Sequence, residues 1–301
     1  MKITSNNEFI KKIVIFFYKI LGYIATQLWK VCNLKRKNKY YFLPYGIGDL
    51  LFIMCYKNYF YDDNTYFIVN SNQKGLMKMY DIPDEKIKVV SEFWKLMLIG
   101  RCMASNYQNK DIIYAHQNRR IIPYKYENEN LLGVKGLSLL DLNKVVLNIP
   151  QDSKVQSPKS ILTKQKKKEI IIQNSFNMNK KNILLCPYAT SSKMVSMDIW
   201  NSIIKKYLKQ GYNIYTNVRN DTEKALENTI PLSLRLEELY GVVDQFEHVY
   251  SLRSGLCDLL AFSDVNLTVY YPPLECDNIY TSYNFKNLGI RDDIEEIITK
   301  K

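Results

Sequence analysis

The sequence is poor in the residues that build metal sites and disulfide frameworks. It has 2 histidines and 6 cysteines in 301 residues, and no two cysteines form a CxxC pair. Structural zinc sites usually contain such pairs or clusters of Cys and His, so the spacing argues against a structural zinc site. Widely separated cysteines with apolar neighbours are typical of reduced thiols in the core of a cytoplasmic protein. The cysteines are Cys32, Cys55, Cys102, Cys186, Cys257 and Cys276.

Glycine and proline are also scarce, with 11 and 9 residues against 24 tyrosines. This composition excludes collagen-like and proline-rich low-complexity chains. No repeat of 20–50 residues is visible, which excludes a solenoid. Hydrophobic residues make up 47%, an ordinary share for a globular protein, and the length predicts two domains of average size.

Positive charge is concentrated at one end of the chain. Residues 1–40 hold nine Lys or Arg and one acid, Glu8, so they carry +8 of the formal +12 and leave +4 for the other 261 residues. A nucleic-acid-binding protein more often spreads its basic residues over a docking face. The charge distribution therefore argues against a nucleic-acid partner.

Residues 9–32 predict a long amphipathic helix with a narrow polar stripe. At about 100° per residue, the remaining circumference is almost entirely Ile, Val, Phe, Leu and Trp. Lys19 interrupts the apolar run, which disfavours a signal peptide and would place a charge near the bilayer centre of a spanning helix. The stripe consists of Lys12, Lys19, Tyr23, Thr26 and Lys30.

A helix lying in the membrane interface fits this segment best, because its lysines and the following Lys35-Arg36-Lys37 would meet anionic headgroups. The alternative is a helix that packs on the protein's own body while its lysines reach water. We therefore expect residues 1–38 to be a basic membrane-association helix. The protein would be cytoplasmic and attached peripherally to the inner face of the cell membrane.

From residue 40 onward, strand and helix patterns alternate, which predicts an α/β protein with two doubly wound, Rossmann-like parallel sheets facing a central cleft. A polar, lysine-rich stretch at 151–169 indicates the domain boundary. The expected units are an N-terminal acceptor-binding domain (39–160), a C-terminal nucleotide-sugar-binding domain (161–275) and a C-terminal helical tail (276–301). Expected strands are 40–44, 65–69, 86–90, 111–115, 183–187, 212–217, 230–232, 248–251 and 265–271. Expected helices are 50–61, 73–80, 93–104, 198–210, 221–228, 236–243, 255–262 and 291–301.

Two turns between a strand and a helix are candidates for chemistry. In the first, Gly46 and Gly48 let the backbone turn sharply and let another group approach, and Asp49 opens the helix. Asp49 is either a helix N-cap or a catalytic carboxylate. In the second, Arg253 precedes Ser254-Gly255, and free amides beside a hydroxyl and a guanidinium suit a diphosphate. The alternative there is a Ser-capped helix with Arg253 in a surface ion pair.

Two further residues follow strands of the C-terminal half. Lys193 lies in a hydroxyl-rich loop and is either a solvated lysine or a cation that neutralises a leaving diphosphate. Glu223 is either a first-turn helix acid or an acceptor for ribose hydroxyls. No convincing DxD segment is present, because Asp62-Asp63 lies in a polar loop.

The order of these features resembles the bacterial heptosyltransferase-like glycosyltransferases, the family 9 enzymes with the GT-B fold. The resemblance spans about 40–271 and is most specific in 183–271, where ILLCPYATSSK is followed by W, GYNIYTN, E, IPL, LEEL and SLRSGLCDLLAF. It implies that Asp49 acts as the general base on an acceptor hydroxyl. It also implies that Lys193 and the Ser254-Gly255 turn hold the diphosphate.

This chain departs from the family at one motif. The family usually shows D-T-G-L-x-H where residues 253–258 read RSGLCD, so both the acid and the histidine are missing. An arginine at the phosphate turn suggests a donor other than ADP-heptose. The residues expected on the donor side are Tyr188, Ser192, Lys193, Asn217, Glu223, Arg253, Ser254 and Gly255.

The resulting hypothesis is an inverting glycosyltransferase that uses no metal or other cofactor. It would move a sugar from a nucleotide-diphosphate donor to a hydroxyl of a cell-surface glycan or lipid-linked acceptor, as in polysaccharide, capsule or lipopolysaccharide biosynthesis. Other GT-B enzymes, such as a fucosyltransferase-like protein or a sugar epimerase, remain open. So does a non-catalytic protein that binds a membrane surface.

Overall fold

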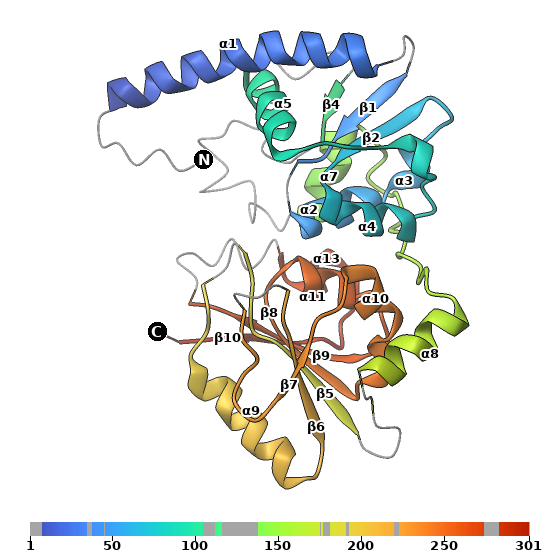
Figure 1. The fold of residues 1–301 in the computed structure, drawn as a ribbon, viewed down its shortest axis with the longest axis vertical. Coiled ribbons are helices and arrows are strands. Elements are labelled where there is room, and N and C mark those ends of the chain that lie inside the picture. Colours follow the sequence, from blue (N-terminus) through green and yellow to red (C-terminus); the bar gives the residue numbers. More distant parts are fainter. Residues whose placement is uncertain are drawn as a thin grey trace.

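The computed structural model describes residues 8–34, 38–44, 46–104, 112–115, 138–174, 176, 181–190, 193–219, 223–273 and 283–300. These residues form two α/β halves, one above the other in Figure 1. Each half contains a parallel sheet with helices on both faces, as the alternating pattern predicts.

The N-terminal half has a four-stranded sheet in the order β3-β2-β1-β4, and every pairing is parallel. Successive residues of β1 point to opposite faces, so Tyr40 packs with Trp29 and Leu98 on one face and Tyr41 packs with Phe67 on the other. The strands are β1 (Lys39–Phe42), β2 (Thr65–Val69), β3 (Ile87–Val89) and β4 (Ile112–Tyr114). The helices are α1 (Glu8–Asn33), α2 (Ile47–Met54), α3 (Lys57–Phe60), α4 (Lys74–Met79), α5 (Glu92–Ala104) and α7 (Leu139–Leu147), with 3₁₀ turns at Ser71–Gln73 and Asp84–Lys86.

The C-terminal half has a six-stranded parallel sheet in the order β10-β9-β8-β5-β6-β7. Helix α9 covers one face, where Trp200 is fully buried against the sheet. The strands are β5 (Asn182–Cys186), β6 (Asn213–Asn217), β7 (Ile230–Leu232), β8 (His248–Leu252), β9 (Asn266–Tyr271) and β10 (Glu295–Ile298). The helices are α8 (Lys164–Gln173), α9 (Met197–Lys209), α10 (Leu236–Gly241), α11 (Gly255–Leu260) and α13 (Phe285–Leu288), with a 3₁₀ turn at Val243–Gln245.

One hydrophobic core joins the two halves. The same cluster of buried side chains includes Leu51 and Leu76 from the N-terminal half and Leu239 and Leu260 from the C-terminal half. Helix α2 contacts α11, and α4 contacts α10. The segment predicted as the boundary, 151–169, connects the halves: residues 151–163 have no helix or strand, and residues 164–169 are the first part of α8.

Two sequence-based expectations about elements are wrong. The chain does not close with a helix over 291–301, because Glu295–Ile298 forms β10 and pairs in parallel with β9. Part of the expected helical tail, 274–282, lies outside the described residues, and α13 is a single short turn. The helix expected over 221–228 is also absent from its described part, 223–228, where Asn228 adopts φ +61° in a turn. Contacts distant in sequence override local propensity at both places.

Candidate functional site

The first candidate turn forms the start of α2. Gly46 is the N-cap, with φ −65° and ψ 172°, and the helix begins at Ile47. Asp49 therefore lies in the first helical turn and is not the N-cap, so that interpretation is wrong. Five consecutive apolar residues, 50–54, are buried and hold the helix against the core. This packing places the Asp49 carboxyl at the amino end of a firmly anchored helix.

The amino ends of α2 and α11 meet between the two halves. A Cβ on Gly48 would lie 2.5 Å from Oδ2 of Asp258 and 3.3 Å from the Cα of Gly255. A Cβ on Gly255 would lie 2.6 Å from the backbone nitrogen of Gly48. Real Cβ atoms do not come so close to a backbone nitrogen, so Gly255 cannot be replaced without moving backbone, whereas a Cβ on Gly48 would displace the side chain of Asp258. The structure thus brings the two candidate turns, which are about 200 residues apart in sequence, into direct contact.

Arg253 points into the C-terminal half. Its guanidinium forms an ion pair with Asp258, and the two side chains are only 11% and 6% exposed. Nη2 also donates to the carbonyl oxygen of Tyr283 at 3.2 Å, and Nη1 contacts Sγ of Cys257 at 3.3 Å. The guanidinium carbon lies 5.0 Å from the ring centroid of Phe285. The expected alternative, a surface ion pair of Arg253, is therefore correct about the pairing and wrong about its location, because the pair is buried.

The ion pair occupies the two positions at which the sequence departs from the D-T-G-L-x-H motif. Arg253 stands at the position of the acid and Asp258 at the position of the histidine. The two departures contact each other, and the buried guanidinium of Arg253 is neutralised by the carboxylate of Asp258.

The carboxyl of Asp258 also interacts electrostatically with Asp49 of the first turn. Burial raises the pKa of the Asp258 carboxyl to about 6, the charge of Arg253 opposes this increase, and the charge of Asp49 adds to it. The carboxyls of Asp49 and Asp258 therefore lie close enough to interact across the contact between the halves. Sequence analysis did not identify Asp258 as a site residue. The available signal was its position five residues after Arg253, in the segment 253–258 that differs from the D-T-G-L-x-H motif.

Further predicted donor residues lie at or just after the carboxyl ends of β5 and β6, and β5 is the neighbour of β8 in the sheet. Parallel strands place these ends at one edge, where ligands of doubly wound sheets bind. Lys193 is exposed there, and Tyr188 donates its hydroxyl hydrogen to the carbonyl oxygen of Lys224. Asn217 ends β6 and is buried. Ser192 lies outside the described residues.

The carboxylate of Glu223 forms an ion pair with the guanidinium of Arg219. Its Oε2 accepts the backbone N–H of Arg219 at 2.8 Å, and its Oε1 accepts Nε of the same residue at 2.9 Å. Burial raises the pKa of Glu223, but the bonds from Arg219 outweigh burial and lower it. Nη1 of Arg219 reaches Oγ1 of Thr190 at 2.9 Å and so connects the loops after β5 and β6. Sequence analysis missed Arg219, and the only available signal was the pair of opposite charges four residues apart.

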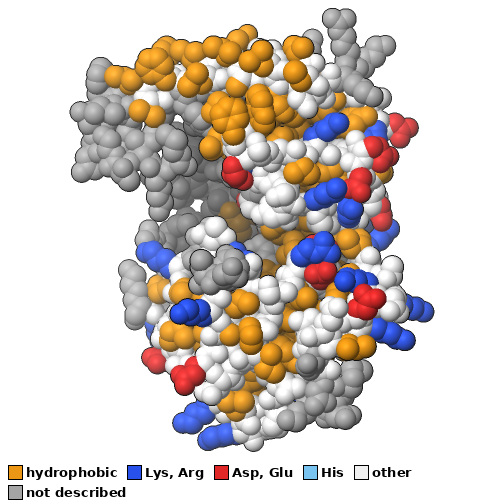
Figure 2. Space-filling model, viewed as in Figure 1, with side chains coloured by type: hydrophobic (Ala, Val, Ile, Leu, Met, Phe, Trp, Pro, Cys, Tyr) orange, Lys and Arg blue, Asp and Glu red, His pale blue; other side chains and the backbone are white. Residues whose placement is uncertain are grey.

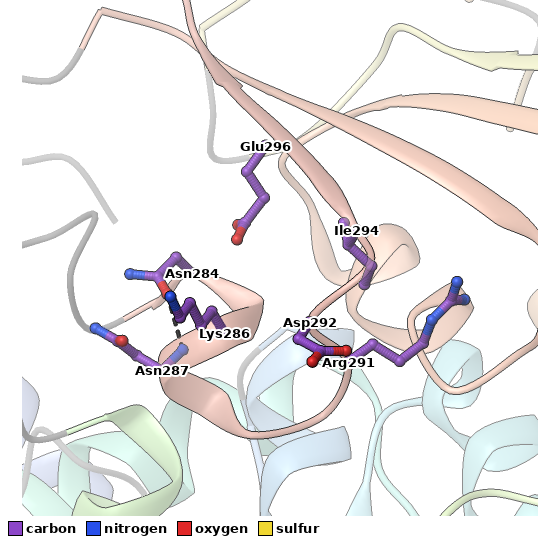
Figure 3. A pocket seen from close by; sticks show the side chains of 7 residues that line it. All are labelled: Asn284, Lys286, Asn287, Arg291, Asp292, Ile294 and Glu296. Carbon is purple, nitrogen blue, oxygen red and sulfur yellow. Dashed lines mark hydrogen bonds between the residues drawn. The ribbon is translucent and has the colours of Figure 1, made fainter.

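A pocket of about 360 Å³ lies beside α13 and the start of β10. Figure 3 shows that its polar side chains come from α13, the following loop and β10. Glu296, which lines it, accepts the backbone N–H of Phe285 at 3.1 Å. None of its residues was predicted from sequence. They are Asn284, Lys286, Asn287, Arg291, Asp292, Ile294 and Glu296.

The described part of the chain contains neither a metal-binding cluster nor a membrane-spanning helix. In it, no three His, Cys, Asp or Glu side chains gather where they could hold a metal ion. None of its helices combines the length and the apolar character needed to cross a bilayer.

Comparison with known proteins finds similarity of structure but none of sequence. No protein-family model matches the chain, and no curated protein sequence matches it. A glycosyl transferase family 9 structure from Veillonella parvula has a TM-score of 0.58 at 12% identity, over 88% of this chain and 87% of that one. The E. coli ADP-heptose heptosyltransferase II has a TM-score of 0.57 at 12% identity, over 86% and 90%.

A third structure, the E. coli heptosyltransferase WaaC with ADP, has a TM-score of 0.51 at 13% identity, over 87% of this chain and 93% of that one. These similarities extend over both halves of the chain, and they confirm the expected architecture. The chain has the two-domain α/β fold of the family 9 glycosyltransferase and heptosyltransferase structures.

Proposed function

We propose that this chain is an inverting glycosyltransferase that transfers a sugar from a nucleoside-diphosphate donor to a hydroxyl group of a lipid-linked or surface-glycan acceptor. The observation that carries the proposal is the contact between the amino ends of α2 and α11. It joins an acid of the N-terminal half to the turn at the carboxyl end of β8 in the other half. In doubly wound folds, ligands bind at such edges.

In the proposed reaction, the Asp49 carboxylate accepts the proton of the acceptor hydroxyl. The acceptor oxygen attacks the anomeric carbon from the face opposite the leaving group, and the bond between that carbon and the diphosphate oxygen breaks. The nucleoside diphosphate leaves with the electron pair of this bond, so the anomeric configuration inverts. Positioned proton acceptors of this kind contribute about 10²- to 10⁴-fold to a rate.

The leaving diphosphate requires compensating positive charge. Lys193, which is exposed at the carboxyl end of β5, is the cation that we assign to it. Backbone amides of the Ser254-Gly255 turn would add hydrogen bonds. The guanidinium of Arg253 pairs with Asp258, so we infer that it stabilises the Ser254-Gly255 turn. The contact of Arg253 with phosphate stays a prediction. We propose that no metal is needed, because these groups supply the charge.

The first test identifies the nucleotide. Thermal unfolding is measured with UDP, GDP, ADP, CMP and dTDP, each with and without EDTA. We expect one nucleoside diphosphate to raise the midpoint and EDTA to leave that shift unchanged. Lys193→Met should weaken the shift, whereas Lys209→Met, on α9, should not. The absence of a shift with every nucleotide would contradict the proposed donor site.

The second test addresses the base. Asp49→Asn should lower transfer to acceptor by about 10²-fold or more while nucleotide binding persists. Asp84→Asn, at an exposed ion pair with Lys74, is the matched control and should retain full activity. Undiminished turnover by Asp49→Asn would remove this residue from the mechanism. Conversion of the donor without any acceptor would identify an epimerase instead.

A further inference from the structure

Helix α1 turns its more apolar side outward. Phe17 is 58% exposed and Ile24 is 52% exposed, although both are large and apolar. An ordinary surface helix buries such residues and exposes its polar ones. The exposed apolar residues of α1 recur every three or four positions and form one broad stripe. They are Ile13, Phe16, Phe17, Ile20, Leu21, Ile24, Leu28 and Val31.

The opposite side of α1 faces the protein. Gly22, Thr26 and Trp29 are buried, and α1 makes extensive contact with α5. Trp29 belongs to the same core cluster as Leu98 of α5. Thr26 of the predicted polar stripe therefore lies on the packed side. Packing on the protein's own body, the alternative to membrane attachment, takes place through this narrow side and leaves the wide apolar side uncovered.

The exposed apolar surface continues onto α5. Phe93 is 60% exposed, and Leu96 is also exposed. Figure 2 shows hydrophobic side chains along α1 at the top of the view and over α5 beneath it. We name the exposed apolar residues of α1 together with Phe93 and Leu96 the outer apolar face. A contiguous apolar surface of this kind marks an interaction site.

The surrounding charge indicates the partner. Lys19 and Lys30 lie on α1 itself, and residues 1–40 carry a net charge of +8. Lys2, Lys11 and Lys12 precede or begin the helix, while Lys35-Arg36-Lys37 follows it. Two copies of the chain joined through this face would bring two strongly positive segments together, which is unfavourable. An anionic surface would instead be attracted to both ends of the helix.

We infer that the outer apolar face docks onto an anionic lipid bilayer, with α1 lying in the plane of the interface and α5 contributing a second line of contact. Apolar side chains enter the acyl boundary while the flanking lysines and arginines meet headgroup phosphates. The inference does not rest on the proposed transferase activity, because lipid binding is measured without substrate.

Vesicle flotation of the full chain tests the inference. The protein should float with vesicles that contain phosphatidylglycerol, less with pure phosphatidylcholine, and less again at high salt. The double variant Phe17→Asp/Ile24→Asp should lower partitioning by about tenfold or more. Phe93→Asp should lower the partitioning to a smaller extent, which tests whether α5 contacts the bilayer.

Ile172→Asp is the matched control, since Ile172 is 75% exposed but lies on α8 in the other half. It should bind vesicles like the unaltered chain. All substituted positions are exposed, and circular dichroism confirms folding of each variant. Failure of the unaltered chain to float, or normal flotation of the double variant, would overturn the inference. So would a dimer in light scattering that the double variant dissociates, because the face would then join two copies.

Discussion

At the scale of single residues, Arg253 and Asp258 form a buried ion pair. The further contacts of Arg253 stabilise its charge, whereas the surroundings of Asp258 do not. Arg253 has carbonyl, thiol and ring partners besides Asp258. Asp258 faces a second acid, Asp49, and burial already disfavours its charge. Loss of the arginine should therefore harm the fold more than neutralisation of the acid.

We expect Arg253→Met to lower the free energy of unfolding by about 3–5 kcal/mol near neutral pH, because a buried carboxylate loses its cation. Urea unfolding measures this change. Arg235→Met removes an exposed arginine, 69% accessible, from Glu237 and Glu238 and should cost less than about 1 kcal/mol. If both variants lose the same free energy of unfolding, the buried ion pair contributes no more to stability than the exposed one.

The same pair predicts a pH dependence. The pKa of Asp258 rises from 3.8 to about 6 on folding, so the folded state holds this proton more tightly than the unfolded state. The resulting stability is complete below about 3.8 and is lost as the pH rises through 6. Relative to Asp258→Asn, the unaltered chain should lose about 3 kcal/mol across this window. Urea unfolding at several pH values tests the sign, and a relative gain with rising pH would contradict it.

At the scale of elements, the contact between α2 and α11 depends on two glycines. Gly255→Ala would place a methyl group 2.6 Å from the backbone nitrogen of Gly48, and backbone cannot move aside without separating the helices. We expect a loss of about 1–3 kcal/mol in the free energy of unfolding, together with weaker nucleotide binding. In Gly46→Ala the nearest atom would be 3.6 Å away, an ordinary contact, so this control should lose less than about 1 kcal/mol. If both variants behave alike, the helices are not held by this contact.

The elements themselves were largely predictable. Strand β2 at Thr65–Val69 and strand β7 at Ile230–Leu232 have the predicted bounds, and α5 and α9 begin within one residue of the prediction. Strand β2 and helices α5 and α9 have apolar patterns that the local sequence determines. Strand β10 was mistaken for a helix, because its four residues become a strand only by pairing with β9.

At the scale of the whole molecule, the shared core predicts that the two halves unfold together. The chain has 3 tryptophans, Trp29 and Trp94 in the N-terminal half and Trp200 in the other. In a Trp29→Phe/Trp94→Phe variant, fluorescence reports the C-terminal half, and in Trp200→Phe it reports the N-terminal half. Within each variant, the fluorescence and circular dichroism midpoints in urea should coincide. Separate midpoints would show that the core does not couple the halves.

The amino-acid sequence by itself determined the alternation of strands and helices, the division into two parallel sheets and the order of the candidate turns. These follow from local periodicity and from the rule that parallel strands gather their carboxyl ends at one edge. Only the tertiary structure decided that Arg253 turns inward to Asp258, that Gly48 meets Gly255, and that α1 keeps its apolar side uncovered. Each of these depends on the direction of a side chain or on a neighbour far along the chain, and local sequence does not encode either.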